Sequence, residues 1–321
     1  MSDYLQVVES VYADAARSPD SGLCCTASPV WRLPDFVVPE AMLSMNYGCG
    51  STVDPRDLRQ DDTIVYVGVG GGLEALQFAY FTRRAGSVIA VDPVVDMRGR
   101  ARDNFEEAAR VNAWFRPEFV TLLDGSAFTL PVPDDSATIV AQNCLFNIFT
   151  PADFSRALAE VFRVLKPGGM FSTSDPVTPA PLPLAFAADA YLRARCLSGC
   201  ATLDEYLAAI TRVGFGRVEV RSKIPYRYLH PREFPTLSEP VMLESIEVAA
   251  YKTPEGHDGP AIFTGRTATY IGPAPSWDDG HGNVLRFGTP SHVSDNAAER
   301  LSQHADILLT APTYRGRGGC C

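Results

Sequence analysis

Eight cysteines are the side chains of this 321-residue chain best suited to chemistry: Cys24, Cys25, Cys49, Cys144, Cys196, Cys200, Cys320 and Cys321. Two pairs are directly adjacent, and adjacent cysteines form only a strained ring disulfide, so they are poor structural cross-links. Only Cys196 and Cys200 approach the spacing of zinc ligands, and the five histidines are scattered. The set favours a soft ion held loosely by thiolates. The alternative is that single cysteines are buried hydrophobic residues, which we expect for Cys144 beside a predicted strand end.

A glycine-rich turn forms the second candidate site. Gly68, Gly70 and Gly72 alternate after the buried strand expected at 63–67, and Asp92 ends the next strand. Glycines let a ligand approach the backbone, and the acid can accept hydrogen bonds from ribose hydroxyls. The G-x-G-x-G spacing lacks the G-x-x-G step that packs a pyrophosphate against a helix, which argues against NAD. These residues predict a nucleoside-binding turn.

The elements that position both sets alternate between strand and helix. From residue 63 onward, continuous apolar runs alternate with segments of helical periodicity, and short turns such as 166-KPGG-169 separate them. This alternation predicts an α/β fold with a doubly wound, mostly parallel, Rossmann-like sheet. We expect three parts: an N-terminal helical lid with a cysteine loop (1–60), a core (61–240) and a small β-rich C-terminal extension ending in Cys-Cys (241–321).

Composition and charge exclude several classes of partner. The net charge of −10 leaves no basic stripe for nucleic acid. The longest apolar runs are too short and interrupted to cross a bilayer, and the N-terminus has acids but no basic region of a secretory signal. We therefore expect a cytoplasmic protein that acts on a small molecule, without nucleic-acid or membrane partners.

Particular motifs resemble a known family. The helix-KPGG-strand at 153–175 resembles class I S-adenosylmethionine (SAM) methyltransferases. Outside this core, four segments resemble arsenite methyltransferases, especially the type linked to arsenosugar biosynthesis: 24-CCT-26, 47-YGCG-50, 142-QNCLFN-147 and 196-CLSG-199. That type also ends in a β-rich extension with a terminal Cys-Cys, like Cys320 and Cys321 here. The resemblance covers almost the whole chain.

The resemblance implies an activity and a cofactor. It implies a SAM-dependent methyltransferase that moves a methyl group to trivalent arsenic, as arsenite or methylarsenite, with a thiol reductant as partner. Arsenic bound to thiolates keeps a lone pair that can attack the sulfonium methyl, so the protein must supply near-attack geometry and exclude water.

The resemblance also implies roles for individual residues. Catalytic thiolates would be Cys49 and Cys196, with Cys24 or Cys25 as a mobile third, Cys200 as an additional arsenic ligand and the terminal pair as a capture or relay site. The implied cofactor contacts are Tyr47, Gly68, Gly70, Gly72, Asp92, Pro93, Ser126, Ala127 and Asn143.

Three departures from the family pattern lie at the cofactor turn. Tyr66 stands where the family has an acid two residues before the first glycine, Val69 replaces a frequent cysteine, and Leu73-Glu74 replace Arg-Asp. Two alternatives therefore stay open. One is a SAM-dependent enzyme that methylates an organic nucleophile or cyclises SAM itself. The other is a thiol-rich metalloid-binding protein without catalysis.

Overall fold

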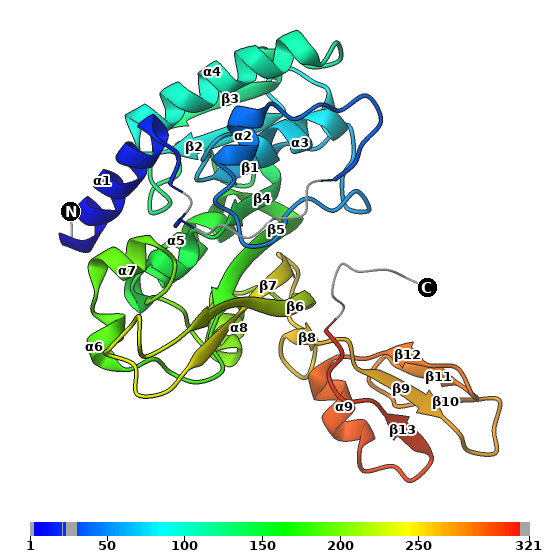
Figure 1. Ribbon diagram of the computed structural model, residues 1–321. Helices are drawn as coiled ribbons and strands as arrows, with labels where there is room; N and C mark the ends of the chain where they lie inside the picture. The colour runs from blue at the N-terminus through cyan, green and yellow to red at the C-terminus, as the bar shows by residue number, and fades with distance from the viewer. Residues whose placement is uncertain (1–2, 21, 24–30, 315–321) are drawn as a thin grey trace.

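The structure consists of a large central sheet covered by helices and a small separate C-terminal unit (Figure 1). The computed structural model describes residues 3–20, 22–23 and 31–314. Cys24, Cys25, Cys320 and Cys321 lie outside these residues. Among the described residues, no helix is both long and apolar enough to cross a membrane.

Within the part of the chain that the structure describes, the central sheet has eight strands in the order β3-β2-β1-β4-β5-β7-β6-β8. Their bounds are β1 (Ile64–Val67), β2 (Val88–Asp92), β3 (Val120–Asp124), β4 (Ala137–Asn143), β5 (Leu165–Val177), β6 (Arg217–Leu229), β7 (Val241–Tyr251) and β8 (Ala261–Phe263). The four residues of β1 are all buried, and β1 pairs in parallel with both β2 and β4. A strand covered on both faces needs such a continuous apolar run. The predicted fold class, a doubly wound and mostly parallel sheet, is confirmed.

The strand order reverses between β1 and β4. The chain runs outward from β1 through β2 to β3, then returns to β4 and runs the other way to β5. In such sheets ligands bind outside the carboxyl ends of the strands at this reversal. The glycine turn after β1, Asp92 at the end of β2 and Asn143 at the end of β4 all lie there.

Helices cover the two faces of the sheet. The α-helices and 3-10 helices up to β6 are α1 (Asp3–Arg17), α2 (Glu40–Ser44), α3 (Leu73–Thr82), α4 (Val95–Val111), η1 (Pro117–Phe119), η2 (Phe146–Ile148), α5 (Pro151–Val164), α6 (Leu184–Ala187), α7 (Ala190–Ala194) and α8 (Leu203–Arg212). Right-handed crossovers on the two sides of the reversal place α3 and α4 on one face and α5 on the other. The Thr150 side chain caps α5, and Thr202 forms a capping box on α8.

Helix α1 lies across the carboxyl end of the sheet and contacts both α4 and α7 (Figure 1). The Tyr4 hydroxyl donates to Asp153 Oδ2 of α5 at 2.6 Å, and Arg100 Nε of α4 donates to Ala16 O at 3.1 Å. Burial, together with the Asp153 carboxylate, raises the pKa of Tyr4 to about 12, so this hydroxyl remains a donor. These contacts anchor the helix over the site.

Strand β7 begins at the domain boundary expected at residue 241, but it does not belong to a separate extension. It lies between β5 and β6 and pairs antiparallel with both, so this segment belongs to the central sheet. The Pro-rich segment 231–240 joins β6 and β7 as a hairpin connection, whereas the sequence pattern placed a domain change there.

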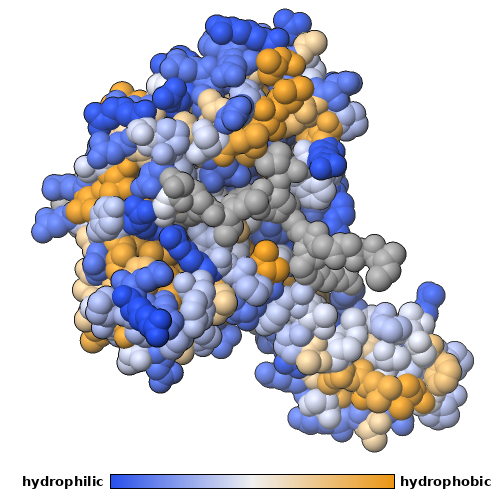
Figure 2. Space-filling model, in the orientation of Figure 1, coloured by the Kyte–Doolittle hydropathy of each residue, from blue (hydrophilic) through white to orange (hydrophobic). Residues whose placement is uncertain are grey.

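The small C-terminal unit has a hydrophobic core of its own, built around Ala268, Tyr270, Leu285, Val293 and Leu301. Its elements are β9 (Thr267–Tyr270), β10 (Ser276–Asp278), β11 (Val284–Arg286), β12 (Ser291–His292), α9 (Asp295–Leu301) and β13 (Ile307–Leu309). Apolar residues form a band across its visible face (Figure 2).

Candidate active site

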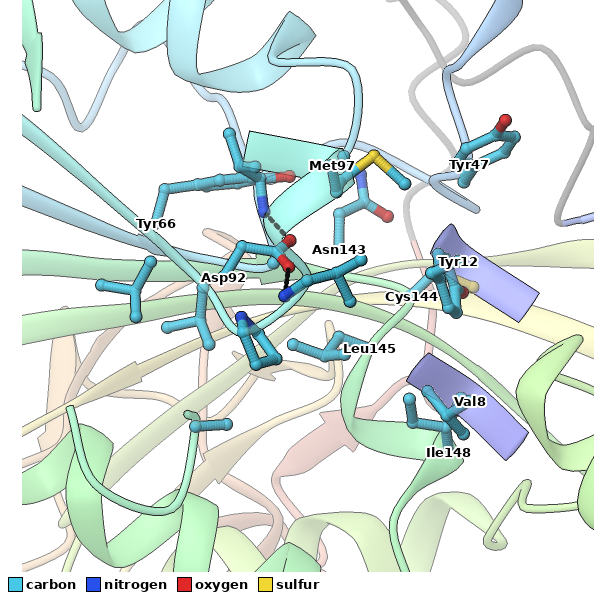
Figure 3. A pocket seen from close by; sticks show the side chains of 18 of the residues that line it. Val8, Tyr12, Tyr47, Tyr66, Asp92, Met97, Asn143, Cys144, Leu145 and Ile148 are labelled. Atoms are coloured by element: carbon cyan, nitrogen blue, oxygen red, sulfur yellow. Dashed lines mark hydrogen bonds between the residues drawn. The ribbon is translucent and has the colours of Figure 1, made fainter. Parts of the chain in front are cut away.

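A deep pocket opens at the carboxyl ends of β1, β2 and β4, with about 1320 Å³ of space including its open mouth. Eight of the nine predicted cofactor residues line it: Tyr47, Gly68, Gly70, Asp92, Pro93, Ser126, Ala127 and Asn143. Gly72 does not line it, although the neighbouring Gly71 does. Figure 3 shows Asp92 and Asn143 on one side and Tyr12 and Val8 of α1 on the other.

The glycines of this turn have two roles, access of a ligand to the backbone and close packing of the chain. Gly68, Gly70 and Gly72 have φ angles of +82°, +52° and +88°, in the left-handed region that favours glycine. A Cβ at Gly70 would meet nothing within 4 Å, whereas one at Gly72 would lie 2.8 Å from the Phe105 ring. Gly70 therefore leaves backbone open toward the pocket, and Gly72 allows the start of α3 to pack against α4.

Asp92 is buried at the end of β2, with only 6% of its surface exposed. Its Oδ2 accepts a hydrogen bond from Val69 N at 3.0 Å, and its Oδ1 accepts one from Val94 N at 2.9 Å (Figure 3). A carboxylate oxygen can accept more than one hydrogen bond, so Asp92 can also accept hydrogen bonds from ligand hydroxyl groups. This arrangement fits a ribose diol, as the sequence predicts.

The acidity of Asp92 predicts a pH dependence of cofactor binding. Burial raises its pKa to about 6, although hydrogen bonds from Val94 N and Val69 N oppose the shift. Protonation removes acceptor capacity, so we expect SAM affinity to fall below about pH 6, by up to roughly tenfold per pH unit. Calorimetry across this range tests it, with Asp92→Asn expected to bind weakly and to flatten the profile. An affinity of the native protein that is constant across that range would contradict the assignment.

The raised pKa of Asp92 affects the stability of the ligand-free fold in the opposite direction to cofactor binding. Because the folded-state pKa lies above the ordinary value of 3.8, the Asp92 contribution to stability is fully present below that value. It is lost as the pH rises through about 6. Acid therefore favours the fold at this residue while weakening the ligand site.

Most of the pocket wall is apolar and was not predicted from the sequence. Its apolar side chains from the core and from α1 include Leu5, Val8, Met97, Phe128, Leu145, Ile148 and Phe149. Leu5 and Val8 recur at helical spacing, which predicts an amphipathic helix but not which surface it covers. These side chains provide an apolar surface for a flat ring and help exclude water.

Asn143 joins the pocket to the segment that carries Cys49. Its Oδ1 accepts from Cys49 N at 3.0 Å, and its Nδ2 donates to Gly50 O at 2.9 Å. Ser172 Oγ donates to Thr52 O at 2.7 Å, and Glu247 Oε1 accepts from Ser51 N at 2.8 Å. Side chains from three strands of the sheet therefore fix the backbone of residues 49–52.

Removing the Asn143 amide should loosen this segment. We expect Asn143→Ala to lower the free energy of unfolding by about 1–3 kcal/mol, because a buried N–H and a buried carbonyl lose their partners. Hydrogen exchange at Cys49 N should become faster by a larger factor than exchange within β1, whose amides are exposed only by global unfolding. Chemical denaturation and exchange mass spectrometry measure both effects. Unchanged exchange at Cys49 would show that other contacts hold the segment.

The two cysteines implied as the main pair both contact the carboxyl end of β4, Cys49 through its backbone N–H and Cys196 through its thiol. The backbone N–H of Cys49 donates to the Asn143 side chain, and the Cys49 Sγ lies 3.4 Å from Ser174 Oγ. Cys196 Sγ donates to Cys144 O at 3.1 Å and lies 3.9 Å from the Tyr12 hydroxyl. Cys144 is itself buried and lines the pocket, so it belongs to both the core and the site. The fold thus brings Cys49 and Cys196 to two neighbouring residues, Asn143 and Cys144.

Backbone strain is concentrated at the same place. Cys144 and Cys196 have φ angles of +59° and +58°, which cost a residue with a Cβ about 1–3 kcal/mol. Such strain persists where surrounding contacts enforce it and clusters at functional sites. Here the hydrogen bond between the two strained residues is one of those contacts.

The predicted arsenic ligands do not form a complete set among the described residues. Cys200 Sγ donates to Cys196 O at 3.6 Å, so this thiol lies next to Cys196. Within the described ranges, however, no three cysteine sulfurs lie within 4.8 Å of one another. Cys24 and Cys25, the predicted third ligand, fall outside those ranges.

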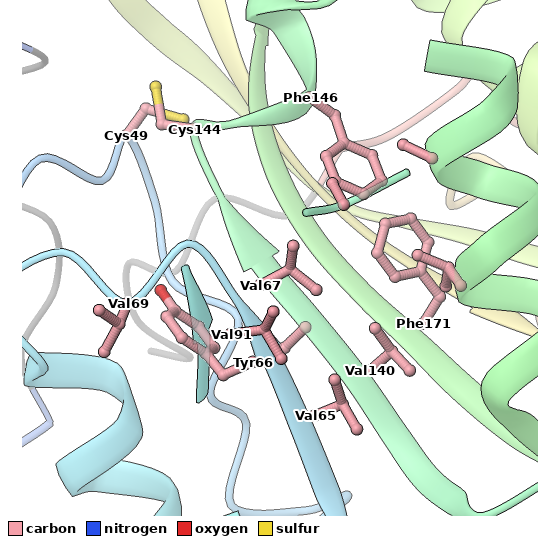
Figure 4. Close-up of a cluster of buried hydrophobic side chains, with 14 of the residues drawn as sticks. Cys49, Val65, Tyr66, Val67, Val69, Val91, Val140, Cys144, Phe146 and Phe171 are labelled. Atoms are coloured by element: carbon pink, nitrogen blue, oxygen red, sulfur yellow. The ribbon is translucent and has the colours of Figure 1, made fainter. Parts of the chain in front are cut away.

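The acid missing before the first glycine has a counterpart that the sequence did not reveal. The Tyr66 hydroxyl donates to Glu74 Oε2 at 3.0 Å, and both residues line the pocket. Val65 and Val67 face the opposite side of the sheet, toward Phe146 and Phe171 (Figure 4). Strand alternation could have predicted the direction of Tyr66, but not its partner on α3.

The sheet and its pocket hold a methyltransferase domain whose cofactor is S-adenosylmethionine. Residues 65–173 match the family model described as a methyltransferase domain. An open glycine cradle, an acid at the end of β2 and an apolar slot fit the nucleoside of this cofactor.

The resemblance to arsenite methyltransferases is confirmed by sequence. The chain is 30% identical over 179 residues to an arsenite methyltransferase of Halobacterium salinarum, covering 56% of this chain and 44% of that protein. It is 27% identical over 221 residues to that of Mus musculus, covering 65% and 57%. The chain thus spans about half the length of the curated relatives it matches.

A solved structure shares the fold. The arsenic(III) S-adenosylmethionine methyltransferase from Chlamydomonas reinhardtii aligns with a TM-score of 0.63 at 23% identity, covering 85% of this chain and 92% of that chain.

Proposed function

We propose that this protein transfers a methyl group from S-adenosylmethionine to thiolate-bound trivalent arsenic. The observation that carries the proposal is that the Cys49 backbone N–H and the Cys196 thiol contact neighbouring residues, Asn143 and Cys144, which both line the cofactor pocket. Bound S-adenosylmethionine supplies an electrophilic methyl group on a sulfonium.

The chain supplies positioning and exclusion of water. Cys49 and Cys196 hold arsenic as thiolates, the form in which cysteine binds soft ions. Tyr12 contacts Cys196 and packs edge-on against Tyr47, with ring centroids 6.3 Å apart, so α1 links the thiols to the pocket wall. Helix α1 and the apolar wall keep water from the reacting groups. A third thiolate from Cys24 or Cys25 completes the arsenic ligands. Accepting a methyl group through the lone pair leaves arsenic formally pentavalent, so two thiolates return it to the trivalent state by forming a disulfide, which the small-molecule thiol reduces.

Arsenite-dependent turnover of SAM tests this proposal. The protein is incubated with SAM and a thiol reductant, with and without As(III), and S-adenosylhomocysteine is quantified. We expect formation of S-adenosylhomocysteine to require As(III). Arsenite-independent formation of methylthioadenosine would instead support cyclisation of SAM. Stoichiometric arsenic binding with no binding of SAM would support a metalloid-binding protein.

A further inference from the structure

Glu74 is a buried acid at the cofactor pocket. It lies in the first turn of α3 with 6% of its surface exposed, and it lines the pocket beside Gly68 and Gly70. Position 66, where related methyltransferases have an acid, is a tyrosine in this chain.

Among the described residues, every hydrogen-bond partner of the Glu74 carboxyl group can act as a donor. Oε1 accepts from Thr52 N at 2.9 Å, while Oε2 accepts from Thr52 Oγ1 at 2.6 Å and from the Tyr66 hydroxyl at 3.0 Å. Thr52 N can only donate and the two hydroxyls can donate as well, so the carboxyl group can accept all three hydrogen bonds. Within the described ranges its partners are Thr52 and Tyr66, and neither side chain carries a positive charge.

Tyr66 is fixed as a donor toward this carboxylate. Its side chain is 5% exposed, and burial followed by the negative charge of Glu74 raises its pKa well above the ordinary value. The tyrosine therefore stays protonated and holds Oε2 in place. A buried carboxylate is costly unless it is paired with a cation. The pocket beside it is where such a cation can enter.

We propose that Glu74 binds the ammonium group of the methionyl part of S-adenosylmethionine, with Tyr66 as the residue that positions it. Tyr66 occupies the place of the usual acid, and its hydroxyl reaches the carboxylate one element away on α3. Tyr66 removes the acid from β1, so Glu74, which stands where the family has Asp, carries the negative charge at this wall of the pocket. The proposal rests on the cofactor site and is independent of which acceptor is methylated.

Two ligands separate ammonium binding from a general structural role. S-adenosylhomocysteine carries the ammonium group but has no methyl to transfer, and methylthioadenosine lacks the amino-acid part. Calorimetry with the full chain should show that Glu74→Gln binds S-adenosylhomocysteine at least about tenfold more weakly, because a charge-assisted bond is lost. Its affinity for methylthioadenosine should stay within about twofold of the native value, because that ligand cannot form this bond.

Thr52→Val is the matched control, since it removes a donor to Glu74 but keeps the charge. We expect Thr52→Val to bind both ligands within about threefold of the native protein. Parallel weakening of both ligands by Glu74→Gln, or unchanged affinity for S-adenosylhomocysteine, would overturn the proposal.

Two further outcomes are distinguishable. If Glu74→Gln does not fold, Glu74→Asp replaces it and should weaken only S-adenosylhomocysteine, while equal or no weakening would again overturn the proposal. Native protein that binds neither ligand would overturn the cofactor site and the proposed function as well. Native binding with an unaffected Glu74→Gln would overturn the role of Glu74 alone.

Discussion

Replacement of Cys49 by serine is expected to reduce arsenic methylation at least about a hundredfold, because losing a ligand misplaces the reacting arsenic. Oxygen is a poor substitute for a thiolate toward a soft ion. The Cys49 side chain is not among the residues that line the cofactor pocket, so the affinity for S-adenosylhomocysteine should be unchanged. Product analysis and calorimetry measure the two quantities on the same preparation, and Cys196→Ser should behave in the same way.

Ser174→Ala is the control for the Cys49 prediction. Ser174 Oγ contacts Cys49 Sγ, and the residue is fully buried at the same depth, but it has no sulfur. This variant should keep methylation within about threefold, since only one weak hydrogen bond is lost. Near-native methylation by both Cys49→Ser and Cys196→Ser would show that these thiols do not bind the substrate.

Replacement of Gly70 by alanine is expected to lower SAM affinity by at least about a hundredfold. The new methyl group meets no protein atom within 4 Å and projects into the pocket, where it occupies space that the cofactor needs. The positive φ of +52° adds about 1–2 kcal/mol of strain to the folded state. Calorimetry measures affinity, and thermal unfolding measures stability.

Gly168→Ala provides a matched comparison for Gly70→Ala. Gly168 also has a positive φ, of +78°, and its added Cβ also meets nothing within 4 Å, but it does not line the pocket. Both variants should therefore lose similar stability, and only Gly70→Ala should lose cofactor binding. Equal SAM affinities in the two variants would place the cofactor elsewhere.

The cofactor half of the site is predictable from sequence because its residues follow strand ends. Gly68 and Gly70 follow β1, Asp92 ends β2 and Asn143 ends β4, and the carboxyl ends of these parallel strands lie at one edge of the sheet. Their positions at the strand ends therefore suffice to place them at one edge of the sheet.

Other features depend on tertiary contacts that local patterns do not encode. Glu74 looks like an ordinary first-turn acid of a helix, and only packing reveals its hydrogen bonds with Tyr66 and Thr52. The strained Cys144 and Cys196 meet because η2 and α7 bring their loops together. Strand β7 looks like the start of an extension, since nothing local shows that it enters the sheet between β5 and β6.

The most direct measurement of arsenic methylation follows the methyl group itself. The full chain is incubated with SAM carrying a deuterated methyl group, As(III) and a thiol reductant, and arsenic species are separated and analysed by mass spectrometry. We predict that deuterated methylarsenic forms in proportion to S-adenosylhomocysteine. If S-adenosylhomocysteine or methylthioadenosine accumulates while all arsenic remains unmethylated, arsenic is not the acceptor.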